Sequence, residues 1–352
     1  MSLISTLGKT VTGALLAAAL MASTAIPAFA QEYTKDNPLK VVLMLHGTQG
    51  DKSFLDSAVA GVKKAADELP VEVKIIEAGY DRSKWQPALA DAADSGYDVV
   101  IAGTFDMTGY IVELAPQYPD VKFIDFDDAP DFANCDCDNI LAVQYGTSTA
   151  GYLAGYAAAK LSKSGKLGTI IGMEFPTVTD FKVGFDQGAK DANPNIEILN
   201  AVAGTFSDPA KGKEIGLAQL NQGADVIFPI AGGTGLGALQ AVKEAGGGKL
   251  AVGVDSDQAT IFAANNDQAQ ADVIFTSVEK KVGESLFLAL KATIDGTQQY
   301  GQRVLLGLKE GAVGISKNAQ YEALVPAELR AEVDALEAKI IAGEITVATD
   351  MK

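Results

Sequence analysis

Short apolar segments alternate with amphipathic segments along nearly the whole chain. The apolar segments are rich in Val, Ile and Phe, which favours strands, and we expect strands at residues 40–45, 71–76, 98–102, 122–126, 139–143, 167–171, 197–200, 225–230, 250–254 and 272–276. Apolar residues recur at helical spacing between most of these strands, and we expect helices at residues 53–69, 84–93, 151–161, 181–192, 209–222, 235–245, 280–294 and 327–342. A hairpin is expected around residues 302–316. Such alternation is typical of a parallel sheet covered by helices on both faces.

The alternation restarts after residue 145, which predicts an α/β protein of two doubly wound lobes. A chain of 352 residues is long enough to form both. No Pro/Ser-rich or charged linker separates the halves, so we expect chain segments to cross between the lobes. Ligands of open α/β sheets bind beyond the carboxyl ends of the strands. The residues that directly follow strands are therefore the candidates for a cleft between the lobes.

The first thirty residues have the pattern of a secretory signal peptide. Lys9 precedes an Ala-rich apolar run at residues 11–22, and Ala28-Phe29-Ala30 forms an A-x-A cleavage site. The alternative, a membrane anchor, needs about 20 apolar residues, and this run is shorter. We expect a mature chain that begins near Gln31 and is exported to a bacterial periplasm. No Cys lies near the cleavage site, so we expect no lipid anchor.

The composition is acidic and poor in metal-ligating residues. The chain has 28 Lys and Arg against 45 Asp and Glu, a formal net charge of −17, and loss of Lys9 with the signal peptide removes one positive charge to make it −18. Binding to nucleic acid needs clustered Lys and Arg, so it is not expected. One His and two Cys fall short of a four-ligand zinc site. The sequence contains no P-loop, no G-x-S-x-G and no Ser/His/Asp order, and we expect no metal, no cofactor and no catalysis.

The two cysteines, Cys135 and Cys137, are separated by a single residue. An exported chain permits a disulfide, although a Cys-x-Cys bridge closes a very small ring with demanding geometry. From the sequence, a disulfide, two free thiols and a metal-binding pair all stay open.

In the first half of the chain, polar and aromatic residues follow two of the expected strands. Asp51 or Ser53 can cap the helix that comes next. Phe54 can face the core or the cleft, and His46 is either a hydrogen-bonding group in the cleft or a solvated loop residue. Asp106 is either an N-cap or an acceptor for a ligand.

In the second half, the same positions carry another set of candidates. Phe206 is either packed in the core or offered to a flat ligand. Gly232 belongs to a Gly-rich turn whose backbone N–H groups can approach a ligand closely; the turn formally matches a dinucleotide fingerprint, which we do not expect an exported protein to use. Asp255 and Asp257 can accept hydrogen bonds from sugar hydroxyls. Lys280 is either solvated or a strand-end cation that faces Asp255 across the cleft.

Eight motifs, in order, resemble those of the basic membrane protein (BMP) family of ABC-transporter substrate-binding proteins. Asp51-Lys-Ser-Phe54 is similar to the family's D-x-S-F-N, with Leu55 in place of the Asn. Residues 146–158 resemble E-G-S-x-L-A-G-Y-x-A, and residues 176–188 resemble P-x-x-x-x-F-x-x-G-F-x-x-G. The other matches lie at residues 208–213, 223–227, 231–235, 253–258 and 276–280. Together they cover about residues 40–345.

The resemblance implies a type I periplasmic-binding-protein fold, in which two Rossmann-like lobes are joined by three crossovers. It assigns residues 38–145 and 275–312 to the N-terminal lobe, and residues 146–274 and 313–352 to the C-terminal lobe. It also implies a monomeric receptor that closes over its ligand by a hinge motion and delivers it to an ABC permease in the inner membrane.

Characterised members of the family bind purine nucleosides, with the base between two Phe rings. Carried over to this sequence, Phe54 and Phe206 would sandwich the base, because aromatic faces stack on flat rings. Asp106 would accept a hydrogen bond from the polar edge of the base, and Gly232 would offer backbone contacts.

The resemblance also implies how the sugar would be held. Asp255 and Lys280 would bind the ribose hydroxyls, since buried charged groups need partners. Asp51, Ser53 and Phe181 lie in the matching motifs and complete the candidate ligand-binding set. Two further functions stay open. One is an exported enzyme such as a nucleoside hydrolase that uses Asp255 and Asp257, and the other is a sensor that presents the same cleft to a signalling partner.

Overall fold

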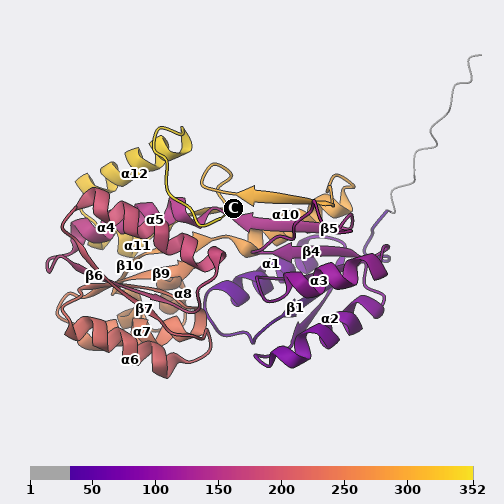
Figure 1. The fold of residues 1–352 in the computed structure, drawn as a ribbon, viewed down its shortest axis with the longest axis horizontal. Helices are drawn as coiled ribbons and strands as arrows, with labels where there is room; N and C mark the ends of the chain where they lie inside the picture. The colour runs from indigo at the N-terminus through magenta and orange to yellow at the C-terminus, as the bar shows by residue number, and fades with distance from the viewer. Residues whose placement is uncertain (1–31, 352) are drawn as a thin grey trace, which may run out of the picture. The chain divides into compact units, whose positions relative to one another are not determined.

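The computed structural model describes residues 32–351, so the predicted signal peptide at residues 1–30 lies outside the described residues. The strands of the described chain form two six-stranded sheets (Figure 1). The first sheet has the order β11-β5-β4-β3-β1-β2 and consists of β1 (Leu39–Leu45), β2 (Val71–Glu77), β3 (Val99–Gly103), β4 (Lys122–Phe126), β5 (Ile140–Tyr145) and β11 (Gln302–Leu306), all paired in parallel. The second has the order β12-β10-β9-β8-β6-β7 and consists of β6 (Lys166–Ile171), β7 (Glu197–Val202), β8 (Val226–Ile230), β9 (Leu250–Asp255), β10 (Ile274–Lys280) and β12 (Val313–Ile315).

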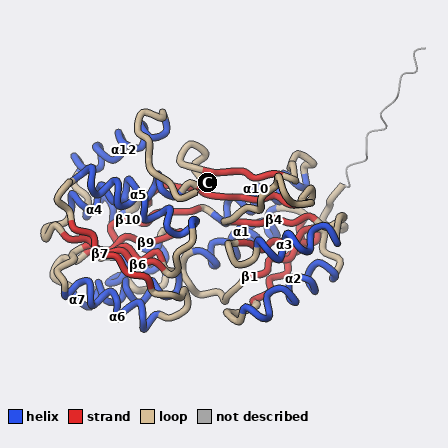
Figure 2. Tube along the Cα trace, viewed as in Figure 1, coloured by secondary structure: helices blue, strands red, loops and turns tan. Residues whose placement is uncertain are grey.

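Helices lie on both faces of each sheet (Figure 2). In the first half of the chain they are α1 (Phe54–Glu68), α2 (Trp85–Asp94), α3 (Thr108–Leu114), α4 (Thr147–Leu161) and α5 (Pro176–Ala192), with 3₁₀ turns η1 (Arg82–Lys84) and η2 (Ala115–Gln117). In the second half they are α6 (Pro209–Asn221), α7 (Gly232–Ala245), α8 (Gln258–Ala264), α9 (Gln268–Ala271), α10 (Val282–Ile294), α11 (Ala319–Leu324) and α12 (Ala327–Ile341).

The side chains of β1 show why the sheet is covered twice. Successive side chains of a strand point to opposite faces. Val41 and Leu43 join the cluster that contains α1, whereas Val42 and Met44 join the cluster that contains α2 and α3, and all four are fully buried. The near-continuous apolar run in the sequence is therefore the mark of a strand buried on both faces, as predicted.

The described chain crosses between the two sheets three times: after β5, after β10 and after β11. The hairpin expected around residues 302–316 is wrong. Strand β11 pairs in parallel with β5 in the first sheet, whereas β12 pairs antiparallel with β10 in the second. The turn between them resembles a hairpin turn in sequence, yet it carries the chain from one sheet to the other.

The sheet membership of β10 differs from the lobe boundaries that we expected. Residues 276–279 pair with β9 in the second sheet, although the expected boundary gave residue 275 onward to the first lobe. The following helix, α10, does pack against α1 of the first lobe, and a Cβ atom on Gly61 would overlap the backbone of Gly283. We therefore propose that the change of lobe falls after Lys280, and the other boundaries stay predictions.

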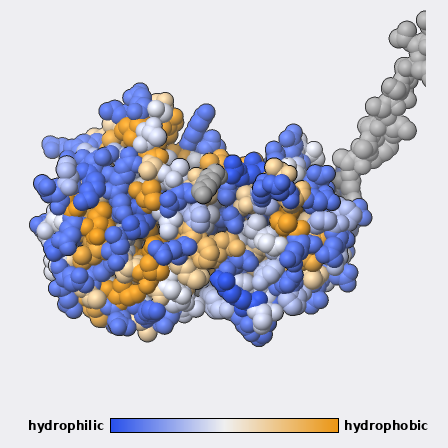
Figure 3. All heavy atoms as spheres, in the orientation of Figure 1, coloured by the Kyte–Doolittle hydropathy of each residue, from blue (hydrophilic) through white to orange (hydrophobic). Residues whose placement is uncertain are grey.

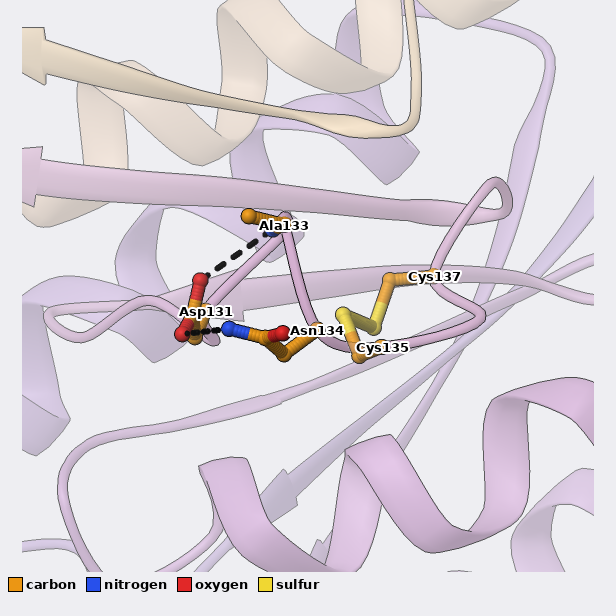
Figure 4. Close-up of a disulfide and its surroundings, with 5 residues drawn as sticks. All are labelled: Asp131, Ala133, Asn134, Cys135 and Cys137. Carbon is orange, nitrogen blue, oxygen red and sulfur yellow. Dashed lines mark hydrogen bonds between the residues drawn. A yellow bond between two sulfur atoms is a disulfide. The ribbon is translucent and has the colours of Figure 1, made fainter.

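Cys135 and Cys137 form a disulfide in the loop that joins β4 to β5 (Figure 4). Their Cα atoms are 5.4 Å apart. In the same loop the carboxylate of Asp131 accepts hydrogen bonds from the backbone N–H of Ala133 and from the side-chain amide of Asn134, at 3.1 and 2.7 Å. Of the three states that the sequence left open, the structure has the disulfide, so neither sulfur is a free thiol or a metal ligand.

Hydrophilic residues cover most of the face seen in Figure 3, with apolar patches mainly over the lobe built on the second sheet. This distribution agrees with the acidic composition. Across residues 32–351, we find no helix with the length and apolar character needed to cross a membrane.

Candidate functional site

A cavity of about 600 Å³ lies beyond the carboxyl ends of strands from both sheets. Loops after β1, β2, β3 and β4 line it from the first sheet, and loops after β6, β7 and β8 line it from the second. The residues that carry its polar and aromatic character are His46, Asp51, Phe54, Tyr80, Arg82, Trp85, Phe105, Asp106, Asp127, Phe175, Phe181, Phe206, Asp255 and Lys280. The rule that ligands bind beyond the carboxyl ends of strands therefore located the cavity correctly.

The buried end of the cavity is built around the ammonium group of Lys280, the last residue of β10. Its Nζ donates to both carboxylate oxygens of Asp127 at 2.9 Å and lies 3.5 Å from Oδ1 of Asp255. The three side chains are between 4 and 9 % exposed. Lys280 is thus a strand-end cation in the cleft, and the alternative of a solvated helical residue is wrong.

Aromatic rings surround the same ammonium group. Its Nζ lies 4.6 Å from the ring centre of Phe54 and 5.0 Å from that of Phe181. These are cation–π distances, and a desolvated cation gains most from such contacts. Phe54 also packs on Phe126, with 5.5 Å between ring centres. Phe54 therefore faces both the cavity and the core, which the sequence had posed as alternatives.

The charges at this end shift one another's pKa values. Burial alone would lower the pKa of Lys280, but the carboxylates of Asp127 and Asp255 outweigh it and raise that pKa. Burial raises the pKa of Asp127 to about 7 against the opposing effect of Lys280, and it raises the pKa of Asp255 as well. One ammonium group cannot compensate two buried carboxylates. One of the two carboxyl groups therefore binds a proton more readily than a carboxyl group in water does.

Backbone strain is concentrated around the cavity. Five described residues other than Gly have a positive φ, and three of them line the cavity: Thr104 at 77°, Asp127 at 69° and Asp255 at 62°. Each of the three stands at the end of a strand. Such conformations cost about 1–3 kcal/mol each and cluster at functional sites. The strain points to this cavity as the functional site of the protein.

The loop between β1 and α1 brings two predicted residues to the cavity in different ways. The carboxylate of Asp51 lines the cavity and accepts backbone hydrogen bonds from Ser53, Leu55 and Asp56 at 2.8–3.1 Å, so it holds the start of α1. Burial raises the pKa of Asp51 to about 6, against these bonds. Ser53 is fully buried behind the lining, and its hydroxyl lies 3.4 Å from Oδ2 of Asp255. We expected Ser53 to bind a ligand directly, but it supports Asp255.

The middle of the cavity is aromatic. Phe206 is half-buried and lines the wall, and Gly172 makes room for it, because a Cβ atom there would overlap its ring. Phe105 follows β3 of the first sheet and Phe175 follows β6 of the second, and their rings stack with centres 3.4 Å apart. Phe206 lies 6.3 Å from Phe105. Gly232, with φ of 50°, lines the cavity beside Phe206 and opens α7.

The outer end of the cavity carries a second ion pair. Nη2 of Arg82 lies 2.5 Å from Oδ1 of Asp106, and their side chains are 57 and 6 % exposed. Burial raises the pKa of Asp106, and Arg82 opposes that rise. Asp106 is not an N-cap, since α3 begins later, at Thr108. His46 lines this region in edge contact with Trp85, and burial, with Arg82 nearby, lowers the pKa of His46 to about 4, so its ring is neutral.

Eight of the nine residues predicted from the sequence line this one cavity, and Ser53 supports it from behind. Asp127, Arg82 and the Phe105–Phe175 pair were missed. Asp127 directly follows β4, so the strand-end rule applies to it as well. Phe105 lies beside Asp106 after β3, but an aromatic residue there fits the core as well as the cavity. Arg82 lies in a 3₁₀ turn and carries no motif.

Comparison with known proteins shows the family of the chain. The model of the family described as ABC transporter substrate-binding protein, PnrA-like, matches residues 39–350. The chain is 33% identical to basic membrane protein A of Borreliella afzelii over 310 residues, which is 88% of this chain and 91% of that protein.

Two solved structures extend the comparison. An ABC transporter solute-binding protein of Aeropyrum pernix K1 matches with a TM-score of 0.79 and 27% identity over 89% of this chain and 94% of that one. A periplasmic solute-binding protein of Actinobacillus succinogenes 130z, which has bound D-allose, matches with a TM-score of 0.62 and 16% identity over 81% of this chain and 99% of that one, and this likeness shows the fold alone.

The type I periplasmic-binding-protein fold with its two doubly wound lobes and three crossovers is therefore confirmed. The relatives are substrate-binding proteins of ABC transporters, which take a small-molecule ligand and work with a permease. On the match over residues 39–350, the chain belongs to the PnrA-like family of ABC transporter substrate-binding proteins.

Proposed function

We propose that the chain is a periplasmic receptor that binds a purine nucleoside, or a similar small aromatic solute, and delivers it to an ABC permease. One observation carries the proposal: the cavity has an aromatic middle between two polar ends, the Lys280 cluster and the Arg82–Asp106 pair. A purine nucleoside has the matching distribution, with a flat base that has polar edges and a ribose that carries hydroxyls. Aromatic faces bind the first part, and paired charged groups bind the second.

An unused acceptor at the buried end supports the position of the ribose. Oδ1 of Asp255 is buried and has no hydrogen-bond partner among the described residues, although Lys280 lies 3.5 Å away. A buried acceptor that makes no hydrogen bond costs free energy even when a cation lies nearby. A ribose hydroxyl that donates to this oxygen would remove that cost. Phe206 would lie beside the base, and Phe181, which contacts Lys280, would lie beside the sugar. Phe54 also contacts Lys280, so in this pose it would lie nearer the sugar than the predicted base sandwich requires.

The proposal includes the route and form of the receptor. We infer that residues 1–30 are cleaved as a signal peptide, that the mature chain is periplasmic without a lipid anchor, and that it acts as a monomer. The A-x-A site and the lack of a Cys beside it support the first two points. Monomeric action rests on the family resemblance.

The enzyme alternative is weaker than the receptor. A hydrolase built on Asp255 would need Asp257 as its second carboxylate. Asp257 instead accepts from the backbone N–H of Thr260, from the hydroxyl of Thr260 and from the side-chain amide of Asn318, and it is not among the residues that line the cavity. A second carboxylate for acid–base work must reach the reacting group.

A thermal-shift screen tests the proposal. The mature chain is heated with purine nucleosides, free bases, D-allose and other sugars, and the products are analysed by chromatography. We expect nucleosides to raise the Tm most, since a ligand that binds only the folded state stabilises it by mass action, and we expect them to be recovered intact. A rise in Tm with sugars alone would contradict the proposal that the ligand is a nucleoside. Release of free base from a nucleoside would contradict the proposal that the protein is a receptor.

A further inference from the structure

Arg82 lies at the outer end of the cavity and belongs to none of the motifs found in the sequence. It begins the 3₁₀ turn that follows β2, and its guanidinium group lies against the face of Trp85 at 5.5 Å. Its Nη2 contacts Oδ1 of Asp106, which follows β3. Two loops of the first sheet, after β2 and β3, thus bring a planar cation and a carboxylate to one edge of the cavity.

The pair leaves hydrogen-bonding capacity on both partners. A guanidinium group carries five N–H donors in a fixed fork, and a carboxylate can accept at both oxygens. Among the described residues, Asp106 is the only acceptor that Arg82 contacts, and only Oδ1 of Asp106 contacts Arg82. This edge of the cavity therefore places the N–H donors of the guanidinium group directly beside the carboxylate oxygens of Asp106.

We propose that Arg82 is a specificity-determining residue, which with Asp106 selects 6-oxopurine nucleosides, guanosine before inosine, over adenosine. The inference rests on the proposed function. Guanine presents two adjacent acceptors, N7 and O6, and next to them two adjacent donors, N1–H and the N2 amino group. The guanidinium fork matches the acceptors, which is the commonest specific contact of Arg with guanine, and the carboxylate matches the donors.

The other purines fit this edge less well. Inosine lacks the N2 amino group, so it loses one of the four contacts. Adenine carries an amino donor at position 6, where the fork needs an acceptor, and an acceptor at N1, where the carboxylate needs a donor. In a shifted pose adenine satisfies only two of the four contacts. A site built to hydrogen-bond a ligand discriminates strongly against one that leaves its buried groups unpaired.

Trp85 supplies a direct readout, because it is the only Trp of the chain, lies against Arg82 and lines the cavity. Dissociation constants are measured by quenching of its fluorescence and by calorimetry for guanosine, inosine and adenosine. We expect guanosine to bind the wild-type chain at least about tenfold more tightly than adenosine, with inosine between them.

The test variant is Arg82→Gln, with Arg82→Lys beside it. Both should bring guanosine and adenosine within about threefold of each other, since Lys keeps the charge but loses the planar fork. The matched control is Lys84→Gln, an exposed cation of the same 3₁₀ turn that pairs with Asp81 away from the cavity and should keep the wild-type ratio.

Two outcomes would overturn the inference and leave the proposed function standing: adenosine binds the wild-type chain as tightly as guanosine, or Arg82→Gln keeps the wild-type ratio. If no nucleoside binds the wild-type chain, the proposed function fails and this inference fails with it.

Discussion

The two polar ends of the cavity differ in burial, in rigidity and in how visible they are in the sequence. At the inner end, Lys280, Asp127 and Asp255 are almost fully buried and contact one another and the surrounding rings. At the outer end, Arg82 is more than half exposed and holds Asp106 through one contact. A buried charge cluster fixes where a polar part of a ligand must lie, whereas a pair with an exposed cation can change between relatives without unfolding the chain.

The largest expected effect comes from removal of the inner cation. Lys280→Met leaves two buried carboxyl groups without their partner, and breaking a buried pair in this way costs about 3–5 kcal/mol. We expect the free energy of unfolding, measured by urea denaturation, to fall by about that amount, and nucleoside binding to be lost.

The neighbouring residue provides a matched control for this change. Lys281→Met alters an exposed side chain one position further along and should leave stability and binding close to wild type. Equal stability of the two variants would show that the inner cluster does not stabilise the fold.

The next largest effect should come from the aromatic middle. Phe206→Ala removes one stacking face, and base–aromatic stacking is worth about 1–3 kcal/mol per base. Affinity for a purine nucleoside, measured by calorimetry, should fall about 10- to 100-fold. Phe132→Ala, a half-buried ring in the disulfide loop outside the cavity, is the control. An unchanged affinity in Phe206→Ala would contradict the stacking model.

A smaller effect should appear in the pH dependence of stability. The pKa of Asp127 is about 7 in the folded chain, raised by burial, against an ordinary value of 3.8. The folded state therefore binds an extra proton between these values, and the contribution of Asp127 to stability is lost as the pH rises through about 7.

Asp127→Asn removes this titration. Burial also raises the pKa of Asp51 and lowers that of His46, but both groups are present in the variant and in the wild type. The fall in Tm from pH 5 to pH 8 should therefore be larger in the unliganded wild type than in Asp127→Asn. The same fall in both proteins would mean that Asp127 does not carry the proton.

The smallest expected effect is on stability at the outer end. Asp106 is buried, but Arg82 is more than half exposed, so solvent weakens the attraction between them. Arg82→Gln should therefore change the free energy of unfolding by about 0–1 kcal/mol, while it changes ligand selectivity. If Arg82→Gln lost as much stability as Lys280→Met, the claim that the two ends differ in their contribution to stability would be wrong.

The contrast also explains what the sequence could predict. Asp255 and Lys280 stand at strand ends inside recognisable motifs, so both the strand-end rule and the family resemblance pointed to them. Asp127 also stands at a strand end, but it lies within an acidic run and outside the matching motifs. Arg82 reaches Asp106 only because the loops after β2 and β3 approach each other in space, and no local pattern records that approach.

The fold shows the same limit. Alternation of apolar and amphipathic segments correctly predicted the strands of both sheets, because a strand buried on two faces leaves a strong local signal. The segment at residues 302–316 also has a local signal for two strands, but their partners, β5 and β10, lie more than thirty residues earlier in the chain and belong to different sheets. Which strands pair is decided by tertiary packing, so the hairpin prediction failed.

One measurement tests the central claim most directly: calorimetric titration of the mature chain with guanosine and, in parallel, with 2′,3′-dideoxyguanosine. If the inner cluster binds ribose hydroxyls and the aromatic middle binds the base, guanosine will bind saturably and the dideoxy compound at least about 100-fold more weakly, because two hydrogen bonds to charged groups are lost. Absence of guanosine binding, or equal affinity for the two compounds, would contradict the account.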